Sequence, residues 1–172
     1  MNEPTFRFSR ESRIRIDGDG HVWHEGERIF HPRLESALAS WVDYDDDAQR
    51  YVLRNALDWC FVTVDHAPLV VRAVHHREGS HFDLDLSDGS TEALDARTVH
   101  VASDGRVYAY VRAKPLVCLF NRVAAFTLLE HATVGPDGTP SLGGVTLKTL
   151  SPGEIPPPRP PAQTPDARAS QP

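Results

Sequence analysis

The stretch Ile14-Arg15-Ile16-Asp17-Gly18-Asp19-Gly20-His21-Val22-Trp23 is repeated in outline by Val99-His100-Val101-Ala102-Ser103-Asp104-Gly105-Arg106-Val107-Tyr108. Each predicts a β-hairpin, because an alternating strand leads through an Asp-Gly turn into a second strand. The match continues at the same offset into a helical pattern, in which Leu34, Leu38 and Trp41 fall on Leu119, Val123 and Phe126. A hairpin-plus-helix unit used twice predicts two related halves whose faces meet. The junction of two such units is a natural place for a ligand.

Length and charge limit the classes of protein that fit. The chain has 172 residues, which allows one domain or two small ones with a stable core. Its formal net charge of −6 disfavours binding to a nucleic acid polymer, which needs a basic surface. No apolar run approaches the roughly 20 residues of a membrane helix, so membrane insertion is not expected. The first residues lack the apolar core of a signal peptide, and we therefore expect a cytoplasmic protein.

The first half is expected to hold a hairpin and a helix. Residues 13–17 and 21–25 form the hairpin, and Pro32 suits a first helical turn, where its missing N–H costs nothing. The helix is expected to end before residues 43–47, whose four aspartates predict a solvated acidic loop. One apolar stripe marks this helix: Leu34, Leu38, Trp41 and Val42.

A run of short strands separated by turn signals follows. Because helical patterns do not intervene, we predict an antiparallel meander. The candidate strands are residues 51–53, 57–64, 69–75, 81–86, 98–101 and 107–111, with residues 91–94 as a weaker candidate.

A second helix and a tail are expected to complete the chain. Pro115 again suits a first turn, and Asn121 is an internal break or cap, because its side chain competes for backbone hydrogen bonds. From Thr133 onward lie ten of the fourteen prolines, which predicts a mostly disordered, proline-rich tail. The apolar stripe of this second helix consists of Leu116, Leu119, Phe120, Val123, Phe126, Leu128 and Leu129.

The cysteines and histidines predict no metal and no cofactor. Cys60 and Cys118 lie in apolar runs and are expected to be reduced and buried, with a disulfide or a reactive thiol as the alternative. A turn at residues 77–80 would place His76 opposite His81, at a spacing that suits zinc. A third or fourth ligand is not evident, so a polar hairpin end is the preferred interpretation.

Catalytic signatures are missing, and basic residues give the better indication of function. The sequence has no nucleophile elbow, no phosphate loop and no dinucleotide fingerprint, so we expect no enzyme. Arg112, Lys114 and Arg122 gather near the start of the second predicted helix, where guanidinium groups and the helix dipole hold phosphate. Ordinary surface ion pairs are the alternative. Trp23 and Trp59 are expected in the core, with an aromatic wall for a planar ligand as the alternative.

Four segments, taken in order, carry a resemblance to a known family. They are Val22–Ile29; Asp58 followed by Val64-Asp65-His66-Ala67-Pro68-Leu69; Val111-Arg112; and Leu116-Val117-Cys118-Leu119-Phe120-Asn121-Arg122 with Leu128-Leu129-Glu130. On these residues the chain resembles the bacterial family called domain of unknown function 1285, over about residues 13–132. The resemblance implies a duplicated α+β core whose C-terminal half is similar to a pleckstrin-homology barrel. It also implies a nucleotide-like ligand between the halves and a role in signalling, and at matched positions it favours Arg112, Arg122, Asp58 and Asp65.

Three positions depart from the family pattern. Trp59 stands where the family tends to carry a lysine, and the turns at residues 86–89 and 113–115 differ from those of the family. If these positions contact the ligand, this chain binds either a different ligand or none.

The sequence therefore predicts an α+β protein with a disordered tail. An N-terminal subdomain is expected at residues 12–66, a pleckstrin-like subdomain at residues 67–132 and the tail at residues 133–172. The predicted function is a non-catalytic module that binds a small anionic, nucleotide-like ligand between its halves. Arg112 and Arg122 are expected to hold the anion, and Trp23 or Trp59 to line the wall. A protein-interaction module that uses strand edges and the tail is the alternative.

Overall fold

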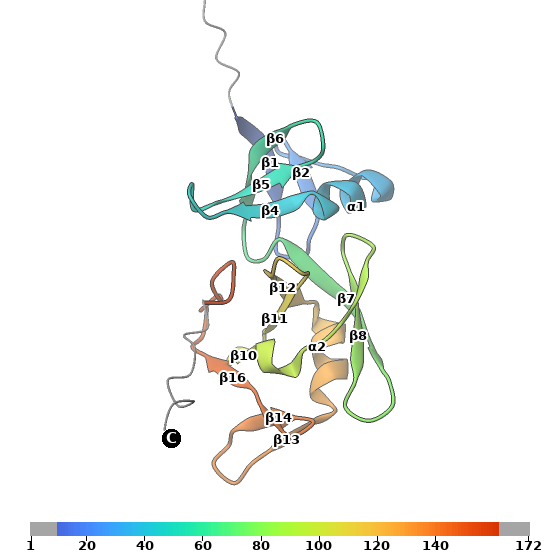
Figure 1. Cartoon of the computed structure of the whole chain (residues 1–172), viewed down its shortest axis with the longest axis vertical. Coiled ribbons are helices and arrows are strands. Elements are labelled where there is room, and N and C mark those ends of the chain that lie inside the picture. Colours follow the sequence, from blue (N-terminus) through green and yellow to red (C-terminus); the bar gives the residue numbers. More distant parts are fainter. Residues whose placement is uncertain (1–9, 162–172) are drawn as a thin grey trace, which may run out of the picture.

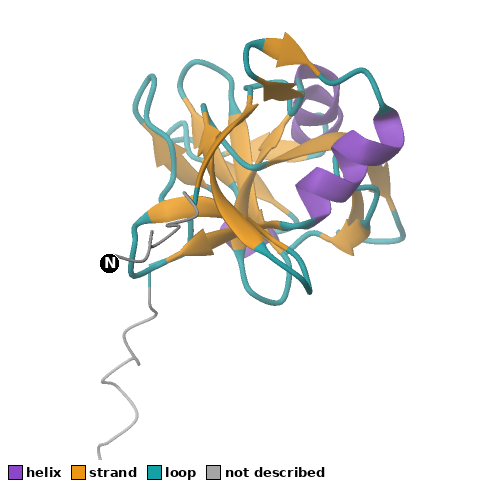
Figure 2. Ribbon diagram, turned by 90° about the horizontal axis from the view of Figure 1, so that it is seen from above, coloured by secondary structure: helices purple, strands orange, loops and turns teal. Residues whose placement is uncertain are grey.

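The computed structural model describes residues 10–161 as two mixed sheets, one above the other along the long axis (Figure 1). Viewed along that axis, the strands overlie one another and the two α-helices lie at the edge of the molecule (Figure 2). Most of the regular structure is β-sheet, and two α-helices accompany it. The protein therefore belongs to the α+β class, as predicted.

The first sheet has six strands in the order β3-β2-β1-β6-β5-β4. Asp17 shapes its first turn, because its carboxylate accepts the N–H groups of Asp19 and His21. The elements are β1 (Glu11–Ile16), β2 (Val22–His24), β3 (Glu27–Arg28), α1 (Pro32–Ser40), β4 (Val42–Asp45), β5 (Arg50–Arg54) and β6 (Trp59–Val64).

The second sheet has seven strands in the order β16-β10-β11-β12-β7-β8-β9, and a small third sheet joins β13, β14 and β15. The elements of the central part are β7 (Leu69–His76), β8 (Phe82–Leu86), β9 (Thr91–Ala93), the 3₁₀ helix η1 (Ala96–Thr98), β10 (His100–Ala102), β11 (Val107–Val111) and β12 (Leu116–Phe120). The C-terminal elements are α2 (Arg122–Leu129), β13 (Ala132–Val134), β14 (Pro140–Leu142), β15 (Val145–Thr146) and β16 (Lys148–Leu150).

Both large sheets are connected in the same way. In each, two antiparallel three-stranded meanders run outward from a parallel central pair, β1 with β6 and β7 with β12. The helix α1 links the meanders of the first sheet, and η1 stands in the same place in the second. The sequence similarity, in contrast, matches the hairpin β1–β2 to the hairpin β10–β11. These hairpins are not equivalent, because β1 belongs to the central parallel pair of its sheet and β10 does not. The helical part of the similarity is wrong, because Leu119 lies in a strand.

Most of the predicted strands are present, but four predictions are corrected. The meander is not purely antiparallel, because β1–β6, β7–β12 and β10–β16 pair in parallel. Residues 42–45 form β4 and pair with β5, so the acidic stretch is only partly a loop. Residues 116–120 form the fully buried strand β12, and the second helix begins only at Arg122.

The tail is the fourth correction. Residues 132–150 add four short strands, and β16 pairs with β10 at the edge of the second sheet. Leu142 and Leu147 are buried in the core of that sheet, which offsets the entropy of ordering the segment. Residues 133–161 are therefore part of the fold, and residues 162–172 of the predicted tail lie outside the described residues.

Arg112 joins the two sheets. It lies in the turn between β11 and β12 with a φ of 75°, and its side chain is only 19% exposed. The guanidinium donates to the carbonyl oxygens of Ala39 in the last turn of α1 and Val42 at the start of β4, at 2.9 and 2.6 Å, and to the Asp88 carboxylate at 2.7 Å. Burial raises the pKa of Asp88, but hydrogen bonds from Ser90 and Arg112 outweigh it, so the pKa is held below its usual range.

Removing the Arg112 guanidinium should destabilise the fold. Asp88 has only 6% of its side chain exposed, so Arg112→Met leaves a buried carboxylate without its cation. We expect the free energy of unfolding, measured by urea denaturation, to fall by about 3 kcal/mol or more. Arg97→Met is the control, because Arg97 is 79% exposed and should change stability by less than about 0.5 kcal/mol. Equal stability of both variants would show that Arg112 does not hold the sheets together.

The ordered tail is tested by Leu142→Ala. This side chain is 1% exposed, and its truncation should cost about 2–5 kcal/mol of unfolding free energy, because the cavity left behind is only partly closed. Thr149→Ala, at an exposed position of the same segment, should be near neutral. A disordered tail predicts no loss of stability for either variant.

Candidate functional site

A cavity of about 430 Å³ lies where the first sheet meets the second. The two Asp-Gly turns of the similar sequence stretches both line it, the first through Gly18 and Asp19 and the second through Asp104, Gly105 and Arg106. The remaining lining residues come from β7, β12 and the start of α2: Val70, Leu119, Phe120, Asn121, Arg122 and Ala125. Its volume is within the range of small-molecule sites.

The turn of the first sheet is held tightly against the second sheet. Gly20 has a φ of 77°, and a Cβ at this position would come within 2.8 Å of the Val70 side chain. A Cβ at Gly18 would come within 2.9 Å of the His66 ring. Only glycine fits both positions without displacing these side chains, so the cavity wall depends on the Asp-Gly sequence itself.

The start of α2 points the positive end of a helix at this cavity. The Asn121 side chain caps the helix by accepting the N–H of Ala124 at 2.7 Å, and its amide donates to the carbonyl of Arg72. The N–H groups of Arg122 and Val123 have no partner within the helix, because they belong to its first turn. This arrangement favours an anion.

Two arginines bring positive charge to the cavity. Arg122 is exposed, and its guanidinium has no ion-pair partner among residues 10–161. Arg106 forms an ion pair with Asp104 at 3.2 Å and lies 3.4 Å from the ring of His66. The hydrogen bond from the N–H of Arg106 holds the pKa of Asp104 low, so this carboxylate is charged at neutral pH.

A buried hydroxyl stands behind Arg106. Tyr108 is completely buried, and its hydroxyl has no partner in hydrogen-bonding geometry within the described chain. The nearby Tyr108 hydroxyl is the main cause that raises the pKa of Arg106, which therefore stays cationic.

An apolar cavity of about 400 Å³ adjoins the polar one and shares Gly105, Arg122 and Ala125 with it. Val123 and Phe126, which the sequence placed on a packed stripe, are 72% and 66% exposed here. The two cavities together thus offer positive charge next to an aromatic surface.

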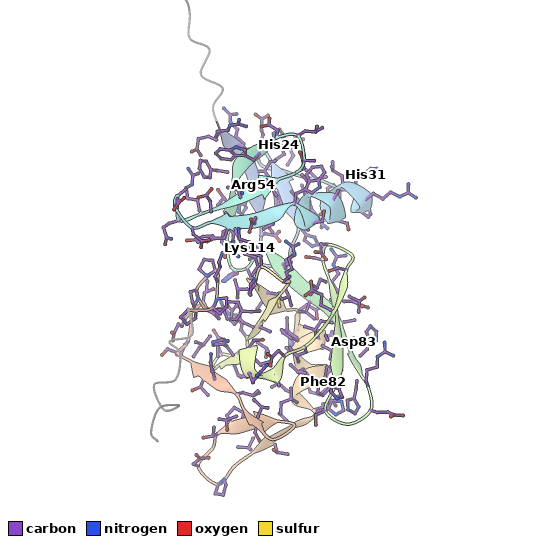
Figure 3. The ribbon with its side chains drawn as sticks, in the orientation of Figure 1. His24, His31, Arg54, Phe82, Asp83 and Lys114 are labelled. Atoms are coloured by element: carbon purple, nitrogen blue, oxygen red, sulfur yellow. The ribbon has the colours of Figure 1, made fainter. Side chains whose placement is uncertain are left out.

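Of the six predicted site residues, only Arg122 lies at this cavity. Arg112 is at the opposite end of β12, where its guanidinium is satisfied by carbonyl oxygens and Asp88. The predicted cluster of Arg112, Lys114 and Arg122 is therefore wrong, because residues 116–120 form an extended strand and not a helical turn. Lys114 forms an ion pair with Asp43 and lies at the boundary of the two sheets, apart from Phe82 and Asp83 (Figure 3).

Trp23 and Asp65 support the first turn from outside the cavity. The indole N–H of Trp23 donates to the Asp17 carboxylate at 2.7 Å. Asp65 pairs with Arg15, and this hydrogen bond lowers the pKa of its carboxyl. Trp23 therefore holds a residue of the turn, Asp65 holds the strand that leads into it, and neither lines the cavity.

Asp58 and Trp59 belong to a different surface. Asp58 pairs with Arg10, whose guanidinium also lies 4.7 Å from the Trp59 ring centre. They border a separate cavity of about 210 Å³ on the first sheet. Trp59 is half-buried and packs edge-on against Phe61.

The sequence did not identify Arg106, Asp19 and Asp104 as site residues. Their signal was present, because both Asp-Gly turns were recognised as similar. Where two halves meet, similar turns from each half can line the same cavity. The structure has this arrangement, because both Asp-Gly turns line the cavity of about 430 Å³.

The pairing of His76 with His81 that a zinc site would need does not form. His76 is opposite Phe82 in the β7–β8 register, and its ring packs 4.4 Å from the ring of His131. Within residues 10–161 no three His, Cys, Asp or Glu side chains gather as a metal site requires. Cys60 and Cys118 are both free thiols, and burial raises the pKa of Cys118 to about 12. No helix of residues 10–161 is long and apolar enough to cross a membrane.

The protein thus has an α+β fold built on two large mixed sheets that a buried arginine joins. Two solved structures have a similar fold. A DUF1285 family protein from Silicibacter pomeroyi DSS-3 superposes with a TM-score of 0.66 at 19% identity, over 80% of this chain and 79% of that one. A DUF1285 family protein from Shewanella baltica OS155 gives 0.58 at 20% identity, over 71% of this chain and 94% of that one. No family model and no curated protein matches the sequence. The chain thus has the fold of DUF1285 proteins, and the structures agree with the resemblance found in its sequence.

The capped start of α2 can be tested by mutation. Asn121→Ala removes the acceptor for the Ala124 N–H and should cost about 1 kcal/mol of unfolding free energy. Asn121→Asp keeps the acceptor and should retain most of the stability. Urea denaturation of both variants measures the difference, and an equal loss would mean that the bond to Arg72, and not the cap, stabilises this corner.

Proposed function

We propose that this protein is a non-catalytic module that binds a small anionic, nucleotide-like ligand between its two sheets and acts in cytoplasmic signalling. The observation that carries the proposal is the exposed, unpaired Arg122 at the start of α2, inside a cavity that both Asp-Gly turns line.

The phosphate binds at Arg122. Its guanidinium and the free N–H groups at the start of α2 supply donors and positive charge together. Arg106 adds a second cation, although part of its charge is neutralised by Asp104. Arg112 has no role in the ligand site in this proposal, because its donors are already used.

A planar base stacks on Phe126. This ring is exposed and lines the apolar cavity that shares Arg122 with the polar one. Asp19 and Asp104 lie on the polar side, where their carboxylates accept hydrogen bonds from hydroxyl or amino groups. A ligand with a phosphate, hydroxyls and an aromatic ring matches all three surfaces, whereas inorganic phosphate uses only the first.

The two sheets are interpreted as related units, and the second as pleckstrin-like. Their common connectivity supports this view, since both place a parallel pair at the centre of two meanders. The boundary between residues 66 and 67 falls in the link between β6 and β7.

The alternative is a protein-interaction module. The exposed apolar side chains Val123 and Phe126 on α2 favour it, because a partner helix or strand covers such a surface as well as a base does. The strands β3 and β9 lie at the edges of the large sheets and offer backbone groups for strand addition.

Thermal unfolding of the full chain with nucleotides, nucleotide second messengers and inorganic phosphate tests the proposal. A ligand at 100 times its Kd should stabilise the protein by about 2.7 kcal/mol. Arg122→Ala should weaken binding roughly 10- to 100-fold, because it removes a charge-assisted hydrogen bond. Phe126→Ala should weaken only ligands that carry a base.

Arg33→Ala is the matched control, because Arg33 is an exposed arginine in the first turn of the other helix. It should bind as the wild type does. Wild-type affinity in Arg122→Ala would refute the site. If no compound shifts the melting temperature of the folded protein, the protein-interaction alternative is favoured.

A further inference from the structure

The C-terminal segment Pro156–Pro161 lies against the contact between the two sheets. After β16 ends at Leu150, five exposed residues lead to Pro156, which is buried. The following prolines and Arg159 then contact residues of β4, β11 and β12. The segment is neither helix nor strand, and side chains and backbone groups of both sheets hold it.

The prolines are recognised through their carbonyl groups. The Tyr110 hydroxyl donates to the carbonyl of Pro157 at 3.0 Å, and the N–H of Val117 donates to the carbonyl of Pro158 at 3.0 Å. Proline has no N–H, so a proline-rich segment leaves its carbonyls free for such donors. Val117 is available because β7 pairs with β12 only from Cys118 onward.

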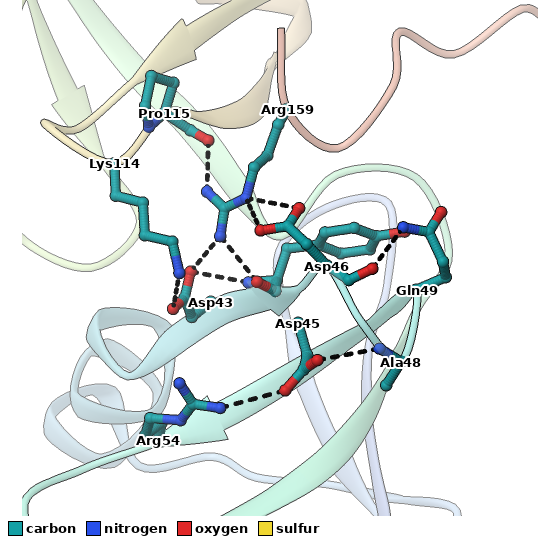
Figure 4. A network of polar contacts seen from close by, with 10 residues as sticks. Asp43, Asp45, Asp46, Ala48, Gln49, Arg54, Lys114, Pro115 and Arg159 are labelled. Carbon is teal, nitrogen blue, oxygen red and sulfur yellow. Dashed lines mark hydrogen bonds and ion pairs between the residues drawn. The ribbon is translucent and has the colours of Figure 1, made fainter. Parts of the chain in front are cut away.

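The arginine is recognised by acidic residues and carbonyls (Figure 4). Arg159 is 16% exposed and donates to the carboxylates of Asp43 at 2.7 Å and Asp46 at 3.1 Å. It also donates to the carbonyl oxygens of Tyr44 and Pro115 and lies 6.0 Å from the Tyr44 ring centre. Burial raises the pKa of Asp43, but Lys114 and Arg159 outweigh it and hold the pKa low, so the carboxylate is charged at neutral pH.

The groups that bind this segment all lie in residues 43–117, within or between the strands of the two large sheets. Tyrosine with prolines and carboxylates with an arginine form the two-part chemistry by which aromatic grooves bind proline-rich peptides. The groove also extends past the segment. A cavity of about 860 Å³ lies beside it, lined by His100, Tyr110 and Lys148, with Pro157 and Pro161 on its border.

We propose that this groove, formed by Asp43, Tyr44, Asp46, Tyr110 and Val117, is a docking site for a proline-rich, arginine-bearing segment of another protein. The chain's own Pro156–Pro161 occupies the site and competes with that partner. Because the segment is tethered to its own groove, its effective concentration there is near the millimolar range. A partner segment must therefore displace it before binding. The site is independent of the cavity at Arg122, because the two share no lining residue.

A fluorescent peptide with the sequence of residues 150–161 tests the proposal by anisotropy, using the full chain. Arg159→Ala weakens the chain's own segment and should raise the affinity of the added peptide at least about tenfold over the wild type. A peptide with alanine in place of its arginine should not bind. Adding Asp43→Asn and Asp46→Asn to Arg159→Ala should abolish binding.

Arg97→Ala is the matched control, because it removes an exposed arginine that pairs only with its neighbour Asp95. It should bind the peptide as weakly as the wild type. No binding to folded Arg159→Ala, or equal binding of the alanine peptide, would overturn the proposal.

A second measurement avoids any dependence on the folding of Arg159→Ala. A protease site inserted in the exposed residues 151–155 allows the folded chain to be cut after purification. The released fragment should dissociate on dilution, and the cut protein should then bind the fluorescent peptide. A cut protein that loses its fragment and fails to bind the peptide would also overturn the proposal.

Discussion

The buried guanidinium of Arg112 is the interaction on which the arrangement of the two sheets depends. Helix α1 has no basic residue in its last turn, so its final carbonyl groups carry an unopposed negative dipole. Arg112 reaches across from the second sheet and donates to one of these carbonyls, that of Ala39, to the carbonyl of Val42 in β4, and to Asp88. An arginine suits this place, because its planar fork directs several N–H donors in fixed directions and keeps its charge when buried. The positive φ of its backbone is the strain that accompanies this placement.

A second arginine, Arg159, reinforces the same contact from the segment that follows β16. Arg159 bridges β4 of the first sheet and the turn before β12 of the second, through Asp43, Asp46 and the Pro115 carbonyl. The acidic stretch thus neutralises Lys114 from the second sheet and Arg159 from the segment that follows β16. The two sheets are therefore expected to unfold together, since separating them takes Lys114 away from Asp43 and the Arg112 guanidinium away from the carbonyls of Ala39 and Val42.

The sequence predicted strands well where alternation was clear, and failed where a short apolar run had no period. Residues 107–111 were predicted with the bounds that β11 has, whereas residues 116–120 read equally well as helix or buried strand. That one error moved Arg112 and Arg122 together in the prediction, although β12 separates them. The tail was misjudged because its prolines outweighed Leu142 and Leu147, whose burial depends on partners distant in sequence. Long-range contacts of this kind leave no local periodicity.

The similar hairpins were assigned the wrong structural relation, but their turns do lie together at the junction of the two sheets. They hold different positions in the two sheets, yet their Asp-Gly turns line one cavity. The physical reason is that a tight turn with glycines lets the backbone of one unit approach the other closely, as Gly18 and Gly20 do against His66 and Val70. Where two such turns meet, backbone and carboxylate groups converge without large side chains filling the space. The proposed ligand site rests on this turn chemistry, and in that proposal Arg122, Arg106 and Phe126, which belong to no repeat, select the ligand.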